Sequence, residues 1–221
     1  RQLLATLGVH IVGHVVQVGT IEATQYDPAE IENNPVRCAD VVAARQMEAL
    51  VSQVSREGDS IGGVVEVLAT GLPPGWGDPV FDKLDARIGA AMFSLGAVKG
   101  MEIGDGFELA TKRGSQTNDP ITPSGFTSNH MGGLLGGIST GAPIVVRLAV
   151  KPTPSIRTPQ QTVDIHNTPV TIEIPGRHDP CICPRLVPVA EAMLAIVLCD
   201  AWLRHCAQPF AHQLRDSNRN A

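Results

Sequence analysis

The sequence predicts an α+β protein with largely antiparallel sheets. Three observations support this class: β-branched runs and amphipathic helical runs both occur, one strand pair has a hairpin pattern, and regular strand–helix–strand alternation is missing. The 221 residues are 43% apolar, which is enough to build a hydrophobic core. Because the chain contains no internal repeat and no low-complexity tract, we expect a single domain over residues 1–221.

The first part of the chain has a strand-then-helix pattern. Residues 9–18 are rich in β-branched side chains, residues 40–56 place apolar side chains on one helical face, and residues 61–68 predict a second strand. Ahead of them, residues 2–7 have the pattern of a last helical turn that ends at Gly8. Because this helix has an end but no start, we expect that the chain is an N-terminally truncated fragment. The alternative explanation is that a terminal tag was removed.

The second part of the chain alternates single helices with strands and a hairpin. The predicted elements are a helix at residues 82–93, strands at 97–103 and 144–151, a hairpin at 161–174 around Asn167-Thr168, and a helix at 189–206. Between them, residues 107–130 are polar and predict a mobile loop that becomes ordered when ligands bind.

Composition excludes several classes of protein. The net charge is -5, only 18% of residues are charged, and no apolar run approaches the roughly 20 residues of a membrane span, so we expect no membrane segment, coiled coil or charged disordered chain. The aromatic residues are five Phe, two Trp and one Tyr, too few for a base-stacking surface, so nucleic acid is not an expected partner.

The numbers of cysteine and arginine residues indicate where in the cell the protein works and which kind of ligand it binds. Five cysteines without a signal peptide favour reduced thiols and a cytoplasmic location. The cations are 13 Arg and 4 Lys, and Arg binds carboxylates and phosphates through paired hydrogen bonds. This bias favours buried oxyanion sites over the alternative that Arg simply coats the surface.

Three segments are candidates for chemistry. Residues 128–141 hold five glycines that could lie against a ligand or could form tight packing turns. Residues 151–156 place one ammonium and two hydroxyls on a proline-stiffened loop, which suits a phosphate but also suits a capped strand exit. Residues 175–181 crowd Arg177, an imidazole and Asp179 between turn formers, as in a catalytic loop or a salt-bridged turn.

Other polar residues are weaker candidates. Cys181 and Cys183 form a Cys-x-Cys pair without a second pair, which is poor zinc spacing, so no metal site is expected. His10 and His14 lie on one face of a strand and could carry protons, but we expect them to be packed in the core or exposed on the surface without a catalytic role.

At these segments the sequence resembles the chorismate synthase family. The motifs that carry the resemblance are, in chain order, Asp59-Ser60-Ile61-Gly62-Gly63, Ala97-Val98-Lys99-Gly100, Ser128-Asn129, Gly132-Gly133, Gly136-Gly137-Ile138-Ser139-Thr140-Gly141, Pro143-Ile144, Lys151-Pro152-Thr153-Pro154-Ser155-Ile156 and Gly176-Arg177-His178-Asp179-Pro180-Cys181. They run over nearly the whole chain, and the last of them is highly specific.

The resemblance implies a lyase of the shikimate pathway, which supplies aromatic amino acid biosynthesis. It implies an anti 1,4-elimination of phosphate from 5-enolpyruvylshikimate 3-phosphate that gives chorismate and needs reduced FMN, with no net redox change. NADPH regenerates the flavin in some members of the family. The implied fold is a sandwich of antiparallel β-sheets around a helical layer, and the implied assembly is a homotetramer.

The resemblance also assigns roles to residues. Gly96, Ala97 and Gly136 match backbone contacts to FMN, and the loop of Lys151, Pro152, Thr153, Pro154 and Ser155 matches the segment around the flavin and its phosphate. Arg177 matches a cation between flavin and substrate, and Asp179 matches the carboxylate that handles the proton at flavin N5. The catalytic candidates are therefore Asp179 and Arg177.

One departure from the family stands out. The motifs of the family's first third, including two histidines and the arginines that bind substrate, have no counterpart in this chain. The alternative to a working enzyme is therefore an inactive fragment that retains flavin-binding or oligomerisation surfaces.

Overall fold

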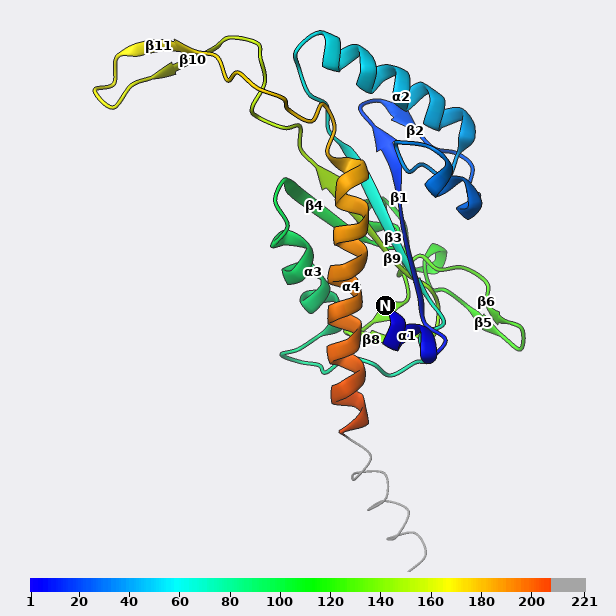
Figure 1. Ribbon diagram of the computed structural model, residues 1–221. Coiled ribbons are helices and arrows are strands. Elements are labelled where there is room, and N and C mark those ends of the chain that lie inside the picture. The colour runs from blue at the N-terminus through cyan, green and yellow to red at the C-terminus, as the bar shows by residue number, and fades with distance from the viewer. Residues whose placement is uncertain (208–221) are drawn as a thin grey trace, which may run out of the picture.

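A five-stranded antiparallel sheet forms the centre of the molecule, as the computed structural model of residues 1–207 shows (Figure 1). The strand order is β2-β1-β3-β9-β4. The strands are β1 (His10–Val18), β2 (Ile21–Glu22), β3 (Gly63–Thr70), β4 (Val98–Ile103) and β9 (Ile144–Val150). Alternate residues of the two middle strands are fully buried on one face: Val65, Val67, Ala69, Ile144, Val146 and Leu148.

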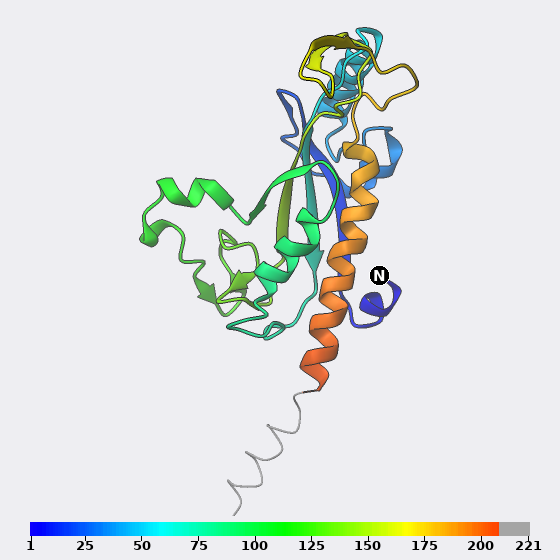
Figure 2. The ribbon, with the colours of Figure 1, turned by 90° about the vertical axis from the view of Figure 1, so that its left-hand side faces the viewer.

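Helices cover that buried face. Residues 1–207 contain four α-helices: α1 (Gln2–Thr6), α2 (Val41–Arg56), α3 (Leu84–Phe93) and α4 (Cys183–Cys206). The long helix α4 runs along the sheet beside α3, as Figures 1 and 2 show. It approaches β1 closely because residue 13 is glycine: a Cβ added there would lie 3.1 Å from Val187 Cγ1 and 3.1 Å from Glu191 Cγ.

Short elements complete the chain outside the sheet. They are the 3₁₀ turns η1 (Pro28–Asn33), η2 (Gly106–Thr111) and η3 (Gly114–Gln116), and the two-stranded pairs β5 (Ile121–Thr122) with β6 (Gly125–Phe126), β7 (Leu134–Leu135) with β8 (Ile138–Ser139), and β10 (Gln160–Val163) with β11 (Pro169–Ile172). The β10–β11 hairpin projects from the body of the molecule (Figure 1), and the chain from η2 to β6 lies on the side of the sheet opposite α4 (Figure 2).

The α+β class and the antiparallel pairing predicted from the sequence are confirmed. Residues 1–207 contribute one large sheet and a helical layer on one of its faces. The predicted strands and helices all occur, and the hairpin turns at Asn167, whose φ of 62° is in the left-handed region. The polar stretch of residues 107–130 contains more structure than predicted, because Asp119 accepts hydrogen bonds from Ser128 Oγ (2.7 Å) and His130 N (2.7 Å).

The last helix begins six residues before the predicted start, at Cys183. The sequence pattern missed this turn because it contains Pro184 and Pro188, which usually mark a helix boundary. In a regular helix the N–H of residue 188 would donate to the carbonyl of Pro184, but proline has no N–H. Arg37 Nη1 donates to that carbonyl instead, at 3.5 Å. A side chain from another part of the chain thus replaces the lost helical bond.

Helix α4 is also long and apolar enough to cross a membrane by length and composition, with a hydropathy of 1.9 over its most apolar window. The expectation that no run of this kind exists is therefore wrong. The helix packs along β1 and α3, and 44% of that window is buried. Helices that pack in a hydrophobic core pass the same test of length and composition.

Asp40 fixes the start of α2 through four backbone bonds. Its Oδ1 accepts from Val42 N (2.9 Å) and Ala43 N (3.0 Å), and its Oδ2 accepts from Thr24 N (3.0 Å) and Gln25 N (3.1 Å). These bonds, those of Ala43 and Thr24 foremost, lower the pKa of the Asp40 carboxyl to about 2. One ionised carboxylate therefore caps the helix and holds the chain after β2 against it.

We expect Asp40 to make stability depend on acid pH. Its folded-state pKa lies below the unfolded value of 3.8, so its contribution is complete above that value and is lost as the pH falls towards 2. The difference in unfolding free energy between the wild type and Asp40→Asn should shrink by about 2 kcal/mol between pH 6 and pH 2. Urea titrations at both values measure this difference, and an equal difference at both would contradict the assignment.

Candidate functional site

A polar pocket of about 230 Å³ lies where three loops meet beyond one end of the sheet. The first loop follows α2, the second follows β9, and the third precedes α4. The lining residues are Ser55, Gly58, Asp59, Ser60, Ser155, Ile156, Arg157, Arg177, His178, Asp179 and Pro180. Three of the predicted site residues, Ser155, Arg177 and Asp179, are thus brought together from distant parts of the chain.

Hydrogen bonds between the loops hold the pocket in shape. Ser60 Oγ donates to the carbonyl of Thr153 at 2.6 Å, and Arg157 N donates to the carbonyl of Gly58 at 3.0 Å. Ile61 N donates to the carbonyl of Pro180 at 2.7 Å. The loop after α2 is therefore bonded to both of the others, and the geometry of the pocket depends on all three.

The two charged candidates differ in their contacts. Asp179 Oδ2 lies 2.7 Å from Arg185 Nη1, and 31% of the Asp179 side chain is exposed. Arg177 is exposed and makes no ion pair or side-chain hydrogen bond with residues 1–207. The carboxylate is therefore held in place by a cation, while the guanidinium keeps all of its donors for an anionic ligand.

The loop after β9 lies against the turn that follows α3. Lys151 N donates to the carbonyl of Ala97 at 2.9 Å, and Ala97 has a φ of 70°, a left-handed conformation that is rare for a residue with a Cβ. Among the described residues, the Lys151 ammonium has only the carbonyl of Pro152, at 3.4 Å, as a partner. The Thr153 hydroxyl is buried without a hydrogen-bond partner among the described residues.

These contacts suit a bound oxyanion. A buried hydroxyl without a partner is costly, and a ligand oxygen would satisfy it. The strained backbone at Ala97 fits a position held for contact with a ligand. The loop that begins at Lys151 therefore starts beside Ala97, and Gly96 precedes Ala97 in the chain. The flavin contacts of these residues stay a prediction.

Gly136 lies elsewhere in the described residues. It occupies the turn between β7 and β8, and the carbonyl of its neighbour Gly137 accepts from Leu84 N at 2.9 Å, at the start of α3. Gly96 and Ala97 follow the other end of α3, and a helix of 10 residues is about 15 Å long. Within residues 1–207, Gly136 therefore does not join the pocket, and its flavin contact stays a prediction.

Several pocket residues were not predicted as site residues, among them Asp59, Ser60 and Arg157. Asp59 and Ser60 belong to a motif that carries the family resemblance, but their place in the pocket becomes visible only through the bond from Ser60 to Thr153. Arg157 has no sequence signal beyond following the Lys151–Ile156 loop, and its Nε and Nη2 donate to the carbonyl of Gly176 at 3.4 and 3.3 Å. It thereby ties the second loop to the third.

Two thiols lie beside the pocket. Cys181 and Cys183 are buried, and no group of three or more potential metal ligands occurs in residues 1–207. A hydrogen bond between the two thiols lowers the pKa of Cys181 and raises that of Cys183.

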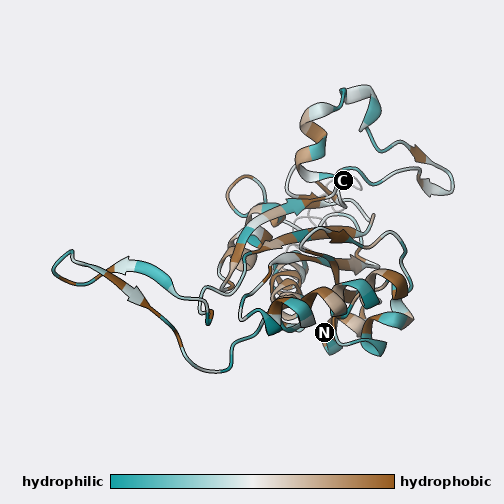
Figure 3. Cartoon of the chain, turned by 90° about the horizontal axis from the view of Figure 1, so that it is seen from above, coloured by the Kyte–Doolittle hydropathy of each residue, from teal (hydrophilic) through white to brown (hydrophobic). Residues whose placement is uncertain are grey.

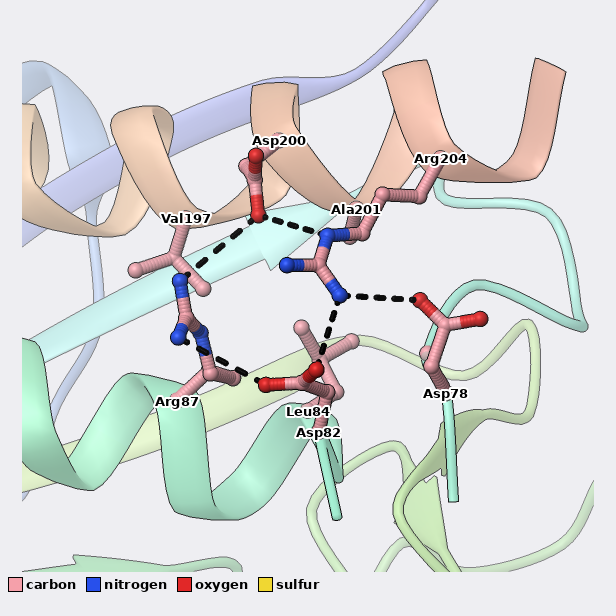
Figure 4. A pocket seen from close by; sticks show the side chains of 9 residues that line it. Asp78, Asp82, Leu84, Arg87, Val197, Asp200, Ala201 and Arg204 are labelled. Atoms are coloured by element: carbon pink, nitrogen blue, oxygen red, sulfur yellow. Dashed lines mark hydrogen bonds and ion pairs between the residues drawn. The ribbon is translucent and has the colours of Figure 1, made fainter. Parts of the chain in front are cut away.

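A second polar cluster joins α3 to α4 and differs from a ligand site. Figure 4 shows Arg87 and Arg204 among three carboxylates, with Arg204 Nη1 2.9 Å from Asp82 Oδ2 and Arg204 Nε 3.2 Å from Asp200 Oδ2. The enclosed volume is about 10 Å³, which is room for one water molecule at most. We therefore interpret this cluster as a structural ion-pair network between the helices.

Comparison with known proteins agrees with this geometry. The family model described as chorismate synthase matches residues 1–203. Curated relatives named chorismate synthase include one from Chloroflexus aggregans, 60% identical over 209 residues, and one from Methanothermobacter thermautotrophicus, 54% identical over 214 residues; each alignment covers 92% of this chain and 57% of the relative.

A solved structure described as "Crystal Structure of Chorismate Synthase" has the same fold. It superposes with a TM-score of 0.75 at 33% identity, over 92% of this chain and 60% of that one. The chain thus spans somewhat more than half the length of the curated relatives it matches. Since the family model covers nearly all of its residues and the solved structure shares its fold, this chain belongs to the chorismate synthase family.

Proposed function

We propose that the protein containing this chain is a chorismate synthase and that the three-loop pocket forms part of its active site. The reaction would be the anti 1,4-elimination of phosphate from 5-enolpyruvylshikimate 3-phosphate to give chorismate. The observation that carries the proposal is the meeting of Ser155, Arg177 and Asp179 in one pocket. These residues come from two separate motifs of the family.

The chemistry of the pocket residues fits an anionic substrate and an anionic cofactor. The Arg177 guanidinium has no side-chain partner within residues 1–207, and its planar donors match carboxylate and phosphate oxygens. In the loop after β9, which reaches the pocket at Ser155, the Lys151 ammonium and the Thr153 hydroxyl lack strong partners among residues 1–207 and suit the phosphate of FMN. Reduced FMN, when bound, would supply electron density that helps the substrate phosphate to leave.

Asp179 is the proposed proton carrier. A carboxylate transfers protons well when it is held at a fixed position, and the ion pair with Arg185 holds Asp179 at the pocket. In the proposed reaction it would manage the proton at flavin N5, next to the guanidinium of Arg177. The Asp179 carboxylate would thus accept the proton in one step of the reaction, and the protonated carboxyl would return it in a later one.

The small volume of the pocket indicates that it is only part of the active site. Pockets for small ligands usually measure about 300–1,000 Å³. The three-loop pocket measures about 230 Å³, which is too small for a flavin and its substrate together. We infer that segments corresponding to the rest of the relatives' length enlarge it. We further propose a homotetramer in the cytoplasm, with NADPH as a source of electrons for the flavin.

We predict that the 221-residue chain by itself turns over little or no substrate, while the protein at its natural length does. The assay is anaerobic, with reduced FMN and 5-enolpyruvylshikimate 3-phosphate, and detects chorismate. Flavin binding without elimination by the natural-length protein would favour the alternative of an inactive, flavin-binding chain. A measurable rate with the 221-residue chain would contradict the inference that the pocket is incomplete.

A further inference from the structure

The loop between β11 and α4 ends in two closely spaced cysteines. It runs from the projecting β10–β11 hairpin to the start of α4 (Figure 3), with Cys181 two residues before Cys183, the first residue of the helix. Both thiols are free and buried, Cys183 completely and Cys181 with 8% exposed. Because Pro180 lines the three-loop pocket and directly precedes Cys181, the pair lies at the edge of that pocket.

The backbone between the two cysteines has the geometry that a disulfide needs. Ile182 has a φ of -92° and a ψ of -7°, a helix-like conformation. In helical backbone the Cα atoms of a residue and of the second residue after it are about 5.4 Å apart. Disulfides join Cα atoms that lie about 4.4–6.8 Å apart. A hydrogen bond joins the two thiols, so the sulfur atoms face each other, and a bond between them needs only a small adjustment of the chain.

Cys181 is the more reactive of the two thiols. A hydrogen bond from the Cys183 thiol, foremost, lowers the pKa of the Cys181 thiol, and the Cys183 backbone N–H adds to this effect against the opposing effect of burial. The same bond between the thiols raises the pKa of Cys183. Cys181 also lies at the N-terminal end of the 24-residue helix α4, where the helix dipole stabilises a thiolate. An attacking thiolate beside a second, protonated thiol is typical of redox-active cysteine pairs.

The other thiols of the described residues lack this arrangement. Cys38 is fully buried, its sulfur accepts a hydrogen bond from Asp40 N at 3.5 Å, and burial, foremost, raises the pKa of its thiol. Cys199 and Cys206 are seven residues apart on α4, about 10 Å along the helix axis, which is too far for a disulfide. The pair before and at the start of α4 therefore differs from the remaining thiols in reactivity and in geometry.

We propose that Cys181 and Cys183 form a modification site, at which hydrogen peroxide oxidises the two thiols to a disulfide. In the first step the Cys181 sulfur attacks one peroxide oxygen. An S–O bond forms, the O–O bond breaks, and hydroxide leaves as water with the proton of the Cys181 thiol. In the second step the Cys183 sulfur attacks the sulfenic acid, so that the S–S bond forms, the S–O bond breaks, and a second water leaves with the Cys183 proton. The two sulfurs together lose two electrons, which the peroxide gains.

Of the two residues, Cys181 is the one that moves when the disulfide forms. Cys183 is fully buried, and its Sγ lies only 3.1 Å from a Cβ added at Gly63 on β3. The sulfur atoms must approach to a bond length of about 2.05 Å, which is shorter than a hydrogen bond. Because Cys183 has no room to shift, the loop that ends at Cys181 has to adjust.

This adjustment reaches the pocket. The carbonyl of Pro180 accepts a hydrogen bond from Ile61 N at 2.7 Å, and Asp179 precedes Pro180 in the chain. We expect the disulfide to weaken this bond and to displace the Asp179 carboxylate. Small displacements of a reacting group lower rates strongly, so the oxidised protein should form chorismate at least about tenfold more slowly.

Mass spectrometry of the natural-length protein tests the site. The reduced protein is treated with hydrogen peroxide, catalase then removes the peroxide, and free thiols are alkylated before digestion. We expect the peptide that holds Cys181 and Cys183 to lose two hydrogen atoms and to take up no alkyl group. Dithiothreitol should restore both thiols. This measurement needs no turnover and does not depend on the proposed function.

Single variants separate the two steps. Cys183→Ser removes the second thiol, so Cys181 should stop at the sulfenic acid, which dimedone traps. Cys181→Ser removes the attacking thiol and should leave Cys183 reduced. Cys38→Ser is the matched control, since it changes a fully buried cysteine outside the pair and should leave disulfide formation unchanged. If circular dichroism shows that a variant does not fold, the mass of the wild-type peptide decides.

Hydrogen exchange tests the movement of the loop. The amide of Ile61 should exchange at least about tenfold faster in the oxidised protein, because its bond to Pro180 is weakened. The amide of Leu84 donates to the carbonyl of Gly137 at 2.9 Å, outside the pocket, and should be unchanged. Chorismate formation should fall on oxidation and recover with dithiothreitol, and this last expectation alone rests on the proposed function.

Four outcomes would overturn the proposal. They are a peroxide-treated pair that still takes up two alkyl groups, a disulfide from Cys181 to a different cysteine, an unchanged exchange rate at Ile61, and an active enzyme whose rate the disulfide leaves unchanged. A protein that forms the disulfide with faster exchange at Ile61, but makes no chorismate in either state, would support the modification site and contradict the proposed function.

Discussion

Asp179→Asn is expected to lower the rate of chorismate formation about 10²- to 10⁴-fold, the usual contribution of a positioned proton carrier. The amide has the shape of the carboxylate but can neither hold nor release the proton, and it also loses the charge that pairs with Arg185 at 2.7 Å. The measurement is the single-turnover rate of the natural-length protein with reduced FMN.

Asp85→Asn is the matched control for this experiment. Asp85 lies on α3, outside the three-loop pocket, and pairs with Lys83 at 2.9 Å. We expect its rate to match the wild type. An Asp179→Asn rate within a few-fold of the wild type, with normal flavin binding, would show that this carboxylate does not handle the proton.

Leu194→Ala is expected to destabilise the folded chain by about 2–5 kcal/mol. Leu194 lies on α4 and is fully buried in the hydrophobic core, so the substitution removes apolar contacts and leaves a cavity. Urea unfolding of the 221-residue chain, followed by circular dichroism, measures the change in free energy.

Ile196→Ala provides the comparison on the same helix. Ile196 is 64% exposed, so the same kind of truncation should cost less than about 1 kcal/mol in the 221-residue chain. Equal losses at the two positions would contradict the assignment of the buried face of α4. A larger loss at Ile196 in the natural-length protein would indicate that other residues cover this side of the helix there.

Local patterns predicted the elements well, and pairings between distant segments were harder to predict. The β-branched run of β1 and the apolar face of α2 are local signals, and both elements occur within one or two residues of the predicted bounds. The first turns of α4 were missed because the effect of Pro188 depends on Arg37, which is remote in the sequence. A sequence pattern over a few neighbouring residues contains no information on a contact between residues as far apart as Arg37 and Pro184.

In the candidate site, too, the local motifs were predictable from the sequence and the contacts between distant segments were not. The motif that contains Arg177 and Asp179 was visible in the sequence, and so was the loop from Lys151 to Ser155. That the two share a pocket with Asp59 follows from the packing of three loops, which periodicity does not encode. The position of Gly136 beside the start of α3 depends in the same way on the tertiary fold.

The bond from Ser60 to Thr153 has a consequence for the order of folding. It joins residues 93 positions apart, and both flank strands of the central sheet, β3 and β9. Closing so long a loop costs chain entropy, and β3 and β9 must pair before the bond can form. The pocket is therefore expected to assemble late in folding, so that ligand affinity appears only after the core is complete.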